Sequence, residues 1–584
     1  MAGALRQLTA RPGAAARGAA ARRGGLLQFA PALALALFLA PVAAGLLGTA
    51  LPAFGYLPAL GGTTFGLAAW RALLAWPGLG DSLALTLTSG LPATILSFAI
   101  VVGFLAACHG TAPLRVVQRL LAPLLAVPHV ALAIGFAFLI APSGWILRLL
   151  SPWATGWQVP PDVALVQDPH GLALAAGLVV KETPFLLMMT LAALERGDAR
   201  ERLAVARSLG YGPVTAWLKT VLPAVYPQIR LPIYAVLAFS LSVVDMALIL
   251  APATPPPLAV LVFRWFGDPD LTLRFAAAAG AVLQLAVVIG CIAGWHGAER
   301  LVAALGRRWA RAGGRGGPGI AARRLWGGLL MLLQATAGLS LLALALWSVT
   351  RRWRYPDALP SDWTLAAWWR QDDALLWAGS TTLTVGLAAT LLALALVLAC
   401  LENEQRNGLT AGSRALWLLY LPLLVPQVSF LFGVQVLTVR LGIEATWLAV
   451  VWIHLLFVLP YVFLALADPF RALDERFARS AFCLGASPDR VFWRVKMPML
   501  LRPVLVAFAV GFAVSVAQYL PTVFAGGGRH PTLTTEAVAL VGGADRRVIG
   551  VYAFLQALLP LAVFAVALTL PTRGAARRAG GRKR

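Results

Sequence analysis

Three charged side chains stand inside long apolar runs of this sequence. Lys181 and Glu182 lie near the middle of the run 171–194, and Asp245 lies deep in the run 229–252. A charge held at membrane depth costs at least about 2.5–3.5 kcal/mol, so each of these groups needs a partner or a water-filled pathway. An acidic group on such a pathway favours a cationic substrate. Asp245 is therefore one candidate for a group that faces a translocation pathway.

Two further polar residues, Gln518 and Tyr519, lie at a similar depth in a later apolar run. Together with the three charged groups they form the set of candidate pathway residues. Lys181 and Glu182 have a second interpretation, because they can neutralise each other or pair with neighbours around Pro184. The pathway interpretation implies that these groups bind or guide a solute, whereas the pairing interpretation gives Lys181 and Glu182 a structural role.

Catalytic and metal-binding patterns do not accompany these groups in the sequence. The six histidines and four cysteines show no metal-ligand spacing, and no Ser/His/Asp set or carboxylate pair is visible. The glycine-rich stretch 526–530 lacks the Lys-Ser/Thr ending of a phosphate-binding loop. We expect neither an enzyme activity, nor a cofactor, nor a resident metal. Any ATP hydrolysis must then come from another chain.

The composition explains which elements must position these residues. Of 584 residues, 60% are hydrophobic and 12% are charged, whereas a soluble domain carries about 25% charged residues. A chain of this kind needs membrane spans to hide its apolar sequence. The net charge of +24 does not indicate nucleic acid, because the basic residues cluster between apolar runs. The sequence predicts an all-α membrane protein in contact with the lipid bilayer.

Twelve apolar runs approach or exceed the roughly 20 residues that a bilayer-spanning helix requires. They form two sets of six on either side of a basic, Gly-rich linker, at 26–50, 82–108, 120–141, 171–194, 229–252 and 271–295, and at 325–349, 374–400, 415–438, 446–468, 503–524 and 548–570. Most of the 48 Lys and Arg residues fall on the side of the N-terminus when the spans alternate. This asymmetry predicts that both termini lie in the cytosol.

The two sets of spans are parallel repeats. Pro128 and Gly135 in the third span match Pro426 and Gly433 in the ninth, with the same spacing. We accordingly expect five parts, namely a basic tail at 1–25, a first half at 26–295 with its core at 82–295, a linker at 296–324, a second half at 325–570 with its core at 374–570, and a basic tail at 571–584.

One cytosolic-type segment occurs once in each half. AVARSLG at 204–210 is followed by Pro213 and Leu222-Pro223, and RSAFCLG at 479–485 is followed by Pro488 and Met497-Pro498. We predict a helix that ends at the glycine, because glycine tolerates the left-handed conformation of a helix terminus. A short amphipathic helix then begins at the first proline and ends at the second, before the chain re-enters the membrane.

These two segments resemble the EAA loops of ABC importer permeases, the inner-membrane components of binding-protein-dependent transport systems. The resemblance covers both halves and is greatest for fused double permeases of the thiamine and ferric-iron type. It implies two six-helix parallel repeats of the type I ABC importer permease fold. It also implies a set of residues that couple to an ATPase, namely Ala206, Gly210, Pro213, Pro223, Ala481, Gly485, Pro488 and Pro498.

The resemblance further implies the partners and the location. We expect two copies of a cytosolic ABC ATPase, a periplasmic substrate-binding protein, and a multi-pass position in a bacterial inner membrane. The substrate would be thiamine, ferric iron or another small ion. Ala204 and Arg479 stand where the family has its glutamate, so an ion pair from that position to the ATPase is not expected.

Two other functions compete with this interpretation. A secondary transporter with six plus six parallel spans would need no ATPase, but the loop after the second span, HGTAPLRVVQR, lacks the Gly/Asp/Arg pattern of that class. A membrane scaffold subunit would transport nothing. ATP dependence of uptake into vesicles separates the three functions.

Overall fold

The computed structural model describes residues 26–409, 413–543 and 545–580. The predicted tail 1–25 therefore lies outside the described residues. Long apolar sequences form helices in a membrane protein because a helix satisfies its own backbone hydrogen bonds. In the first half the elements are η1 (Leu26–Phe29), α2 (Ala30–Ala53), η2 (Pro58–Leu60), α3 (Ala68–Leu74), α4 (Leu79–Cys108), α5 (Ala112–Ala126), α6 (His129–Ile140), α7 (Trp145–Leu150), α8 (Leu172–Glu195), α9 (Ala199–Ser208), α10 (Pro213–Ala216), η3 (Trp217–Val221), α11 (Leu222–Ser242), α12 (Asp245–Leu250), α13 (Leu258–Phe266) and α14 (Leu273–Arg311).

The second half repeats this order and adds a small hairpin near its start. Its elements are α15 (Ile320–Ser348), β1 (Thr350–Arg352), β2 (Asp362–Trp363), α16 (Ala366–Trp369), α17 (Asp372–Asn407), α18 (Ser413–Leu424), α19 (Val428–Arg440), α20 (Trp447–Arg471), α21 (Glu475–Cys483), α22 (Pro488–Val491), η4 (Phe492–Lys496), α23 (Met497–Val516), α24 (Leu520–Gly526), α25 (Leu533–Val541) and α26 (Arg546–Gly580). The strands β1 and β2 pair antiparallel.

Eleven helices among the described residues are long and apolar enough to cross a membrane, and Val428–Arg440 is a shorter apolar helix. The predicted all-α membrane fold with about twelve spans is confirmed. The structure also shows why one span is short, since the chain leaves the helical conformation at Val425-Pro426, between α18 and α19. A residue before proline is forced away from the helical region, so a break at this place is expected.

The helices are interrupted at equivalent positions in the two halves. Pro128 separates α5 from α6 as Pro426 separates α18 from α19. Later in each half, α11 stops at Ser242 before α12, and α23 stops at Val516 before α24. Discontinuous helices expose backbone groups at membrane depth, which is tolerated only inside protein or beside a water-filled cavity. The breaks therefore mark the region where a pathway can lie.

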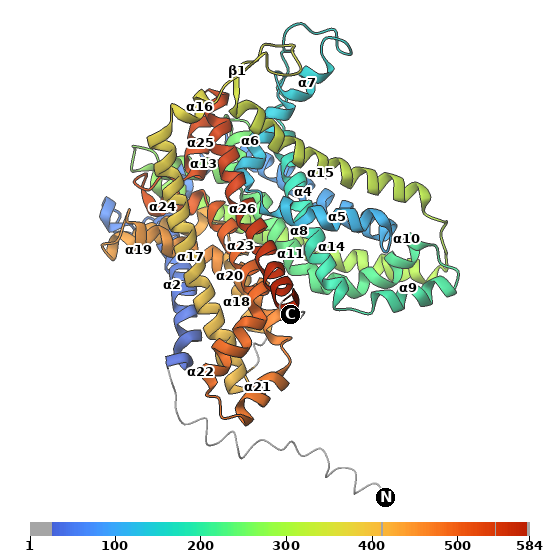
Figure 1. Cartoon of the computed structure of the whole chain (residues 1–584). Helices are drawn as coiled ribbons and strands as arrows, with labels where there is room; N and C mark the ends of the chain where they lie inside the picture. The colour runs from blue at the N-terminus through green and yellow to red at the C-terminus, as the bar shows by residue number, and fades with distance from the viewer. Residues whose placement is uncertain (1–25, 410–412, 544, 581–584) are drawn as a thin grey trace, which may run out of the picture.

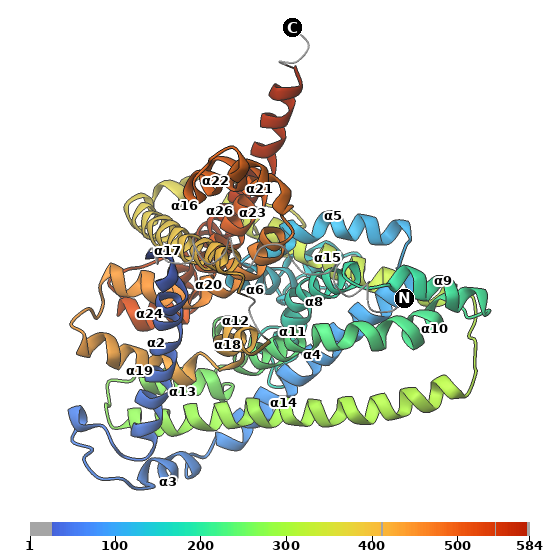
Figure 2. The same ribbon diagram turned by 90° about the horizontal axis from the view of Figure 1, so that it is seen from below.

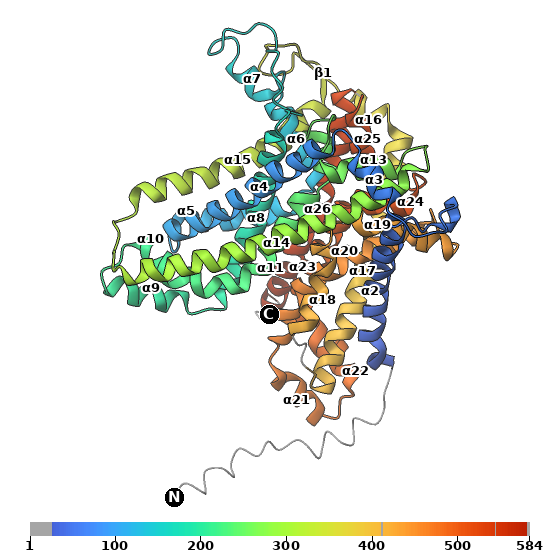
Figure 3. The ribbon, with the colours of Figure 1, turned by 180° about the vertical axis from the view of Figure 1, so that it is seen from behind.

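The long helices of the two halves point in different directions. In Figure 1 the long helices of the second half, such as α17 and α20, run at a large angle to α5, α14 and α15. Figure 2 shows α9 and α10 far from α21 and α22. All four of these short helices lie away from α7 and β1, as Figure 3 confirms from behind. Which of these ends of the molecule faces the cytosol stays a prediction.

The first helix of each half packs against the other half. A Cβ at Gly433 in α19 would overlap the backbone of Gly45 in α2, and a Cβ at Gly135 in α6 would overlap the backbone of Ser340 in α15. Only glycine allows backbones to approach this closely, as at other helix contacts in membranes. The matched glycines of the sequence thus mark two equivalent contacts. In this exchange α2 of the first half packs on α19 of the second half, and α15 of the second half packs on α6 of the first half.

A second contact between the halves lies on the side of α7 and β1. Arg148 in α7 is 4% exposed, and its guanidinium donates to the carbonyl oxygens of Arg354 at 2.6 Å and of Ser143 at 2.9 Å. Its charge also lies 5.0 Å from the ring centroid of Trp353. The Ser151 and Tyr355 hydroxyls are 2.7 Å apart. This contact joins the first half to the hairpin of the second.

Candidate functional site

The two recurring segments have the same helix-ending turn. Gly210 and Gly485 have φ values of +83° and +79°, as the sequence predicted. Tyr211 N donates to the Ala206 carbonyl at 3.1 Å and Gly210 N to that of Arg207 at 2.9 Å. In the second segment the same two bonds join Ala486 to Ala481 and Gly485 to Phe482, at 3.0 and 2.9 Å. Such paired bonds define the Schellman motif, so each segment ends its first helix identically.

The next helix begins at the predicted proline in both segments. Ser487 caps α22 by accepting a hydrogen bond from Arg490 N at 3.4 Å, and Pro488 is its first residue. In the first segment Gly212 precedes Pro213 without a side-chain cap. A proline at the first helical position costs no backbone hydrogen bond, because that N–H has no partner inside the helix.

The prediction that Pro223 and Pro498 end these helices is wrong. From Pro213 to Ser242 and from Pro488 to Val516 the chain is helical throughout, with a single π-helical turn in each case. The N–H groups of Leu222 and Met497 donate five residues back, to Trp217 and Phe492. The wider turn accommodates a proline ring that would clash with the carbonyl of a regular α-helix.

The first segment is packed into the protein, whereas the second stands more exposed. Trp217 and Val221 are fully buried. The same segment also affects His109 at the end of α4, because burial and the nearby charges of Arg207 and Arg200 lower the pKa of this histidine. In α21 no residue is buried. The apolar face of the amphipathic helix predicted for the first segment therefore packs against protein.

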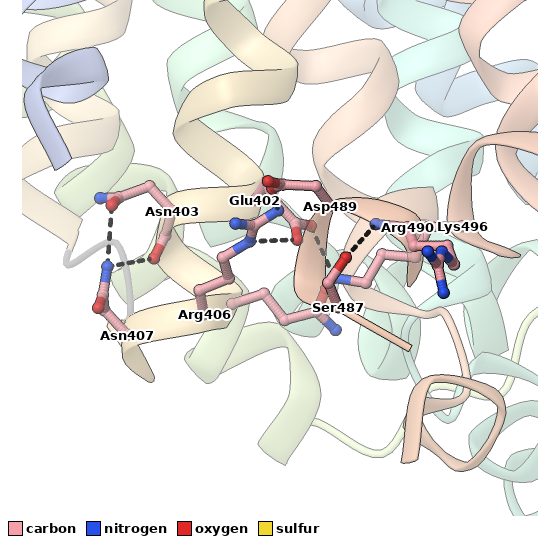
Figure 4. A network of polar contacts seen from close by, with 9 residues as sticks. Glu402, Asn403, Arg406, Asn407, Ser487, Asp489, Arg490 and Lys496 are labelled. Carbon is pink, nitrogen blue, oxygen red and sulfur yellow. Dashed lines mark hydrogen bonds and ion pairs between the residues drawn. The ribbon is translucent and has the colours of Figure 1, made fainter. Parts of the chain in front are cut away.

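A network of ion pairs holds the second segment to the end of α17 (Figure 4). Lys496 Nζ lies 2.6 Å from Glu402 Oε2 and 2.7 Å from Gln405 Oε1. Arg406 bridges Glu402, at 2.8 Å, and Asp489, at 2.9 Å. Glu402 is 3% exposed, so its charge is almost fully removed from solvent. Sequence reasoning missed this network, although Glu402 and Arg406 have the i, i+4 spacing of a helical ion pair.

Arg479, at the position where the EAA motif that this segment resembles has a glutamate, forms an ion pair with Glu475 at 2.6 Å, and both side chains are largely exposed. The charge at this position is therefore reversed and locally paired. Ala204 at the equivalent place in α9 is exposed and offers no polar group.

Lys181 and Glu182 find partners at the break between α5 and α6. Lys181 Nζ donates to the Val127 carbonyl, which the break has freed, and Glu182 lies 3.6 Å from His129 Nε2. Both side chains are buried. Both residues thus pair with neighbours at Pro128 and not around Pro184, where α8 runs unbroken, and their place on a pathway stays a prediction.

Asp245 is the first residue of α12, directly after the break that ends α11. Its carboxylate accepts the Met246 N–H at 2.8 Å and lies within electrostatic range of His129 and Lys181. The structure thus brings Lys181, Glu182 and Asp245 together, with His129 as a member that the sequence did not single out.

Tyr519 extends this cluster into the second half. It lies within electrostatic range of Asp245, and its ring centroid is 6.0 Å from that of Phe263 in α13. It immediately precedes Leu520, which begins α24 as Asp245 begins α12. Gln518 is also at this break, but its side chain donates to the Val514 carbonyl of its own helix at 3.1 Å.

Neutral groups take the place of charges at the break in the second half. The buried His454 lies 2.8 Å from the Ser515 hydroxyl and 2.9 Å from that of Thr522. The Thr522 hydroxyl donates in turn to the Gln518 carbonyl at 2.7 Å. The two halves therefore share their backbone geometry but differ in charge. Among the described residues no group of three or more His, Cys, Asp or Glu side chains could hold a metal ion.

Comparison with known proteins agrees with this geometry. Residues 413–578 match the family described as binding-protein-dependent transport system inner membrane component. The inner membrane ABC transporter permease protein YnjC of Escherichia coli is 36% identical over 504 residues, which cover 85% of this chain and 89% of that protein.

Shorter relatives match only part of the chain. The molybdenum transport system permease protein ModB of Mycobacterium tuberculosis is 29% identical over 217 residues, or 35% of this chain and 78% of its own. The putrescine transport system permease protein PotI of Escherichia coli is 26% identical over 170 residues, or 28% of this chain and 60% of its own. With its helical spans and its long match to YnjC, the chain belongs to the family of ABC transporter permeases, which are membrane transport subunits and not enzymes.

Proposed function

We propose that this permease carries a small solute inward along a pathway between its halves, and that an ATPase drives it through two coupling segments. We define these segments as residues 199–221 and 475–496. One observation carries the proposal. In each half the second helix of the coupling segment continues without a break into the helix that leads to the pathway break, as Pro213–Ser242 and Pro488–Val516.

A continuous helix transmits movement along its axis. A push on α10 would turn or shift α11 as a rigid body and displace its far end at Ser242. Asp245 begins the next helix, so the same movement would change the position of its carboxylate. Alternating access by rigid-body rocking of helices around a central site is the usual behaviour of such repeats.

The proposed substrate is a small cation. The pathway cluster holds two acidic groups, Glu182 and Asp245, against one lysine, and Lys181 already donates to the Val127 carbonyl. The relatives do not decide this point, since their names include putrescine and molybdenum transport. Thiamine and ferric iron remain candidates within the cationic class.

Permeases of this family work with an ATPase and a substrate-binding protein. We propose two copies of the ATPase, one at each coupling segment, because the two segments share their turn and lie far apart (Figure 1). The binding protein would meet the opposite side, at α7 and β1. This assignment places both termini in the cytosol.

The test is transport by proteoliposomes that contain the permease and its ATPase, with the binding protein outside. Wild-type protein should take up substrate only with ATP. Gly485→Arg should insert normally yet hydrolyse ATP with little uptake, because arginine is strained at a φ of +79° and adds bulk to the exposed turn. Gly210→Arg should act likewise. Normal, ATP-coupled uptake by both variants would refute the coupling role of these segments.

A further inference from the structure

The linker between the halves is shorter and more ordered than its composition indicates. Residues 296–311 continue helix α14 and residues 320–324 begin α15, so only 312–319 lie outside helices. A Gly-rich stretch of this kind usually behaves as a flexible tether. Here Gly313, Gly316 and Gly319 all take left-handed conformations, with φ between +70° and +72°.

The linker runs along the first coupling segment and bonds to it. Gly212 N donates to the Arg315 carbonyl at 2.8 Å, and Lys219 Nζ donates to the Gly314 carbonyl at 2.8 Å. Lys219 also stands 4.7 Å from the ring centroid of Trp309, at the end of α14. One lysine thus contacts both the linker and the helix that leads to it.

Glycines make this approach possible. A Cβ at Gly212 would overlap the Gly317 carbonyl, and a Cβ at Gly316 would overlap the Thr215 hydroxyl. The φ of Gly316 would in addition strain any other residue. The glycines therefore serve close contact between two backbones, and not only flexibility.

The second coupling segment lacks such a contact. Ser487 stands at the place of Gly212 and caps its own helix, and Arg494 stands at the place of Lys219. Within the described part of the chain, the Arg494 side chain makes no hydrogen bond or ion pair. The second segment is held instead by Glu402 and Arg406 of α17.

We propose that residues 312–319 form a strap that fixes the first coupling segment to α14, with Lys219 as its positioning residue. The ATPase then meets a surface built from α10 and the linker at one segment, and from α21 and α22 alone at the other. This proposal rests on the proposed coupling function. It makes the linker a working part of the transporter and not merely a connection between two halves.

Limited trypsin digestion of the full chain in nanodiscs tests the strap without any transport. Cleavage after Arg311 and Arg315, followed by mass spectrometry, reports how often the strap opens, since proteolysis tracks the population of open states. Lys219→Met loses a charged hydrogen bond and a cation–π contact, which predicts roughly tenfold faster cleavage. Lys219→Arg should stay near wild type, and Arg494→Met should not change cleavage of the linker. Equal cleavage of Lys219→Met and wild type would refute the strap.

The positioning role has its own readout, the amount of substrate taken up per ATP hydrolysed in the reconstituted complex. Lys219→Met should lower this ratio at least twofold while the permease still inserts and binds the ATPase, and Lys219→Arg should restore it. Faster cleavage with an unchanged ratio would overturn the positioning role. Failure of the proposed function is distinguishable, because then Gly210→Arg and Gly485→Arg would also leave uptake normal.

Discussion

The ion pair between Glu402 and Lys496 provides the sharpest test of how the second coupling segment is held. Their atoms are 2.6 Å apart, and the two side chains are 3% and 10% exposed. Arg406 shares the Glu402 carboxylate and continues the network to Asp489 in α22 (Figure 4). The segment therefore depends on one buried carboxylate that neutralises two cations.

Glu402→Gln keeps the shape of the side chain and removes its charge. Lys496 would then remain buried with only neutral amide oxygens as acceptors, that of Gln405 and that of the introduced glutamine. Breaking a buried ion pair on one side costs about 3–5 kcal/mol, and Gln405 should reduce the loss to the lower end of that range. Since about 1.4 kcal/mol is a factor of ten, local opening should become roughly a hundredfold more frequent.

Hydrogen–deuterium exchange of α21 and α22 in the purified permease measures this opening. Amides of these helices should exchange roughly a hundredfold faster in Glu402→Gln, whereas α8 and α20 should be unaffected. Glu475→Gln is the matched control, because it removes one partner of the exposed pair with Arg479. That pair should contribute less than about 1 kcal/mol.

Replacing both partners by leucine completes the cycle. The double variant Glu402→Leu with Lys496→Leu removes both charges of the pair, so that neither stays buried without its partner. The double variant should therefore be more stable than Glu402→Leu alone. The reasoning is refuted if Glu402→Gln exchanges no faster than Glu475→Gln, or if the two leucine substitutions simply add.

Two further predictions concern the exchanged helices and the pathway. Gly433→Ala should destabilise the fold by about 1–3 kcal/mol, because the new methyl group meets the Gly45 backbone. Thermal unfolding measures this loss against the control Gly290→Ala, where the added methyl group meets nothing within 4 Å. Equal stability of the two variants would contradict the close contact between α2 and α19. In Asp245→Asn the concentration of a cationic substrate that gives half-maximal uptake should rise at least tenfold, while ATP hydrolysis persists. Unchanged uptake kinetics and selectivity would exclude Asp245 from the pathway.

The asymmetry of the two halves follows from these contacts. The first half places Lys181, Glu182 and Asp245 at its breaks and receives the linker at its coupling segment. The second half satisfies its break with neutral groups around His454 and anchors its coupling segment through Glu402. A fused chain allows the two halves to differ in this way, because each occurs once per molecule.

The sequence by itself determined the spans, the repeat and the helix-ending turns. Hydropathy over about 20 residues is a local property, and so is the need for glycine at a φ near +80°, which is why Gly210 and Gly485 could be identified without a structure. The candidate pathway residues were also chosen locally, since any charge inside an apolar run is conspicuous, and their role stays a prediction.

Only the tertiary structure decided which distant groups meet. The partner of Lys181 is a carbonyl 54 residues away, and Lys496 pairs with a residue 94 positions before it. The exchange of α2 and α15 and the strap on the first coupling segment likewise join segments that no local pattern connects. Hydropathy shows that a helix spans a bilayer but not which face meets which neighbour, because helix contacts in a membrane depend on the close fit of small residues and on polar pairs brought together by the whole fold.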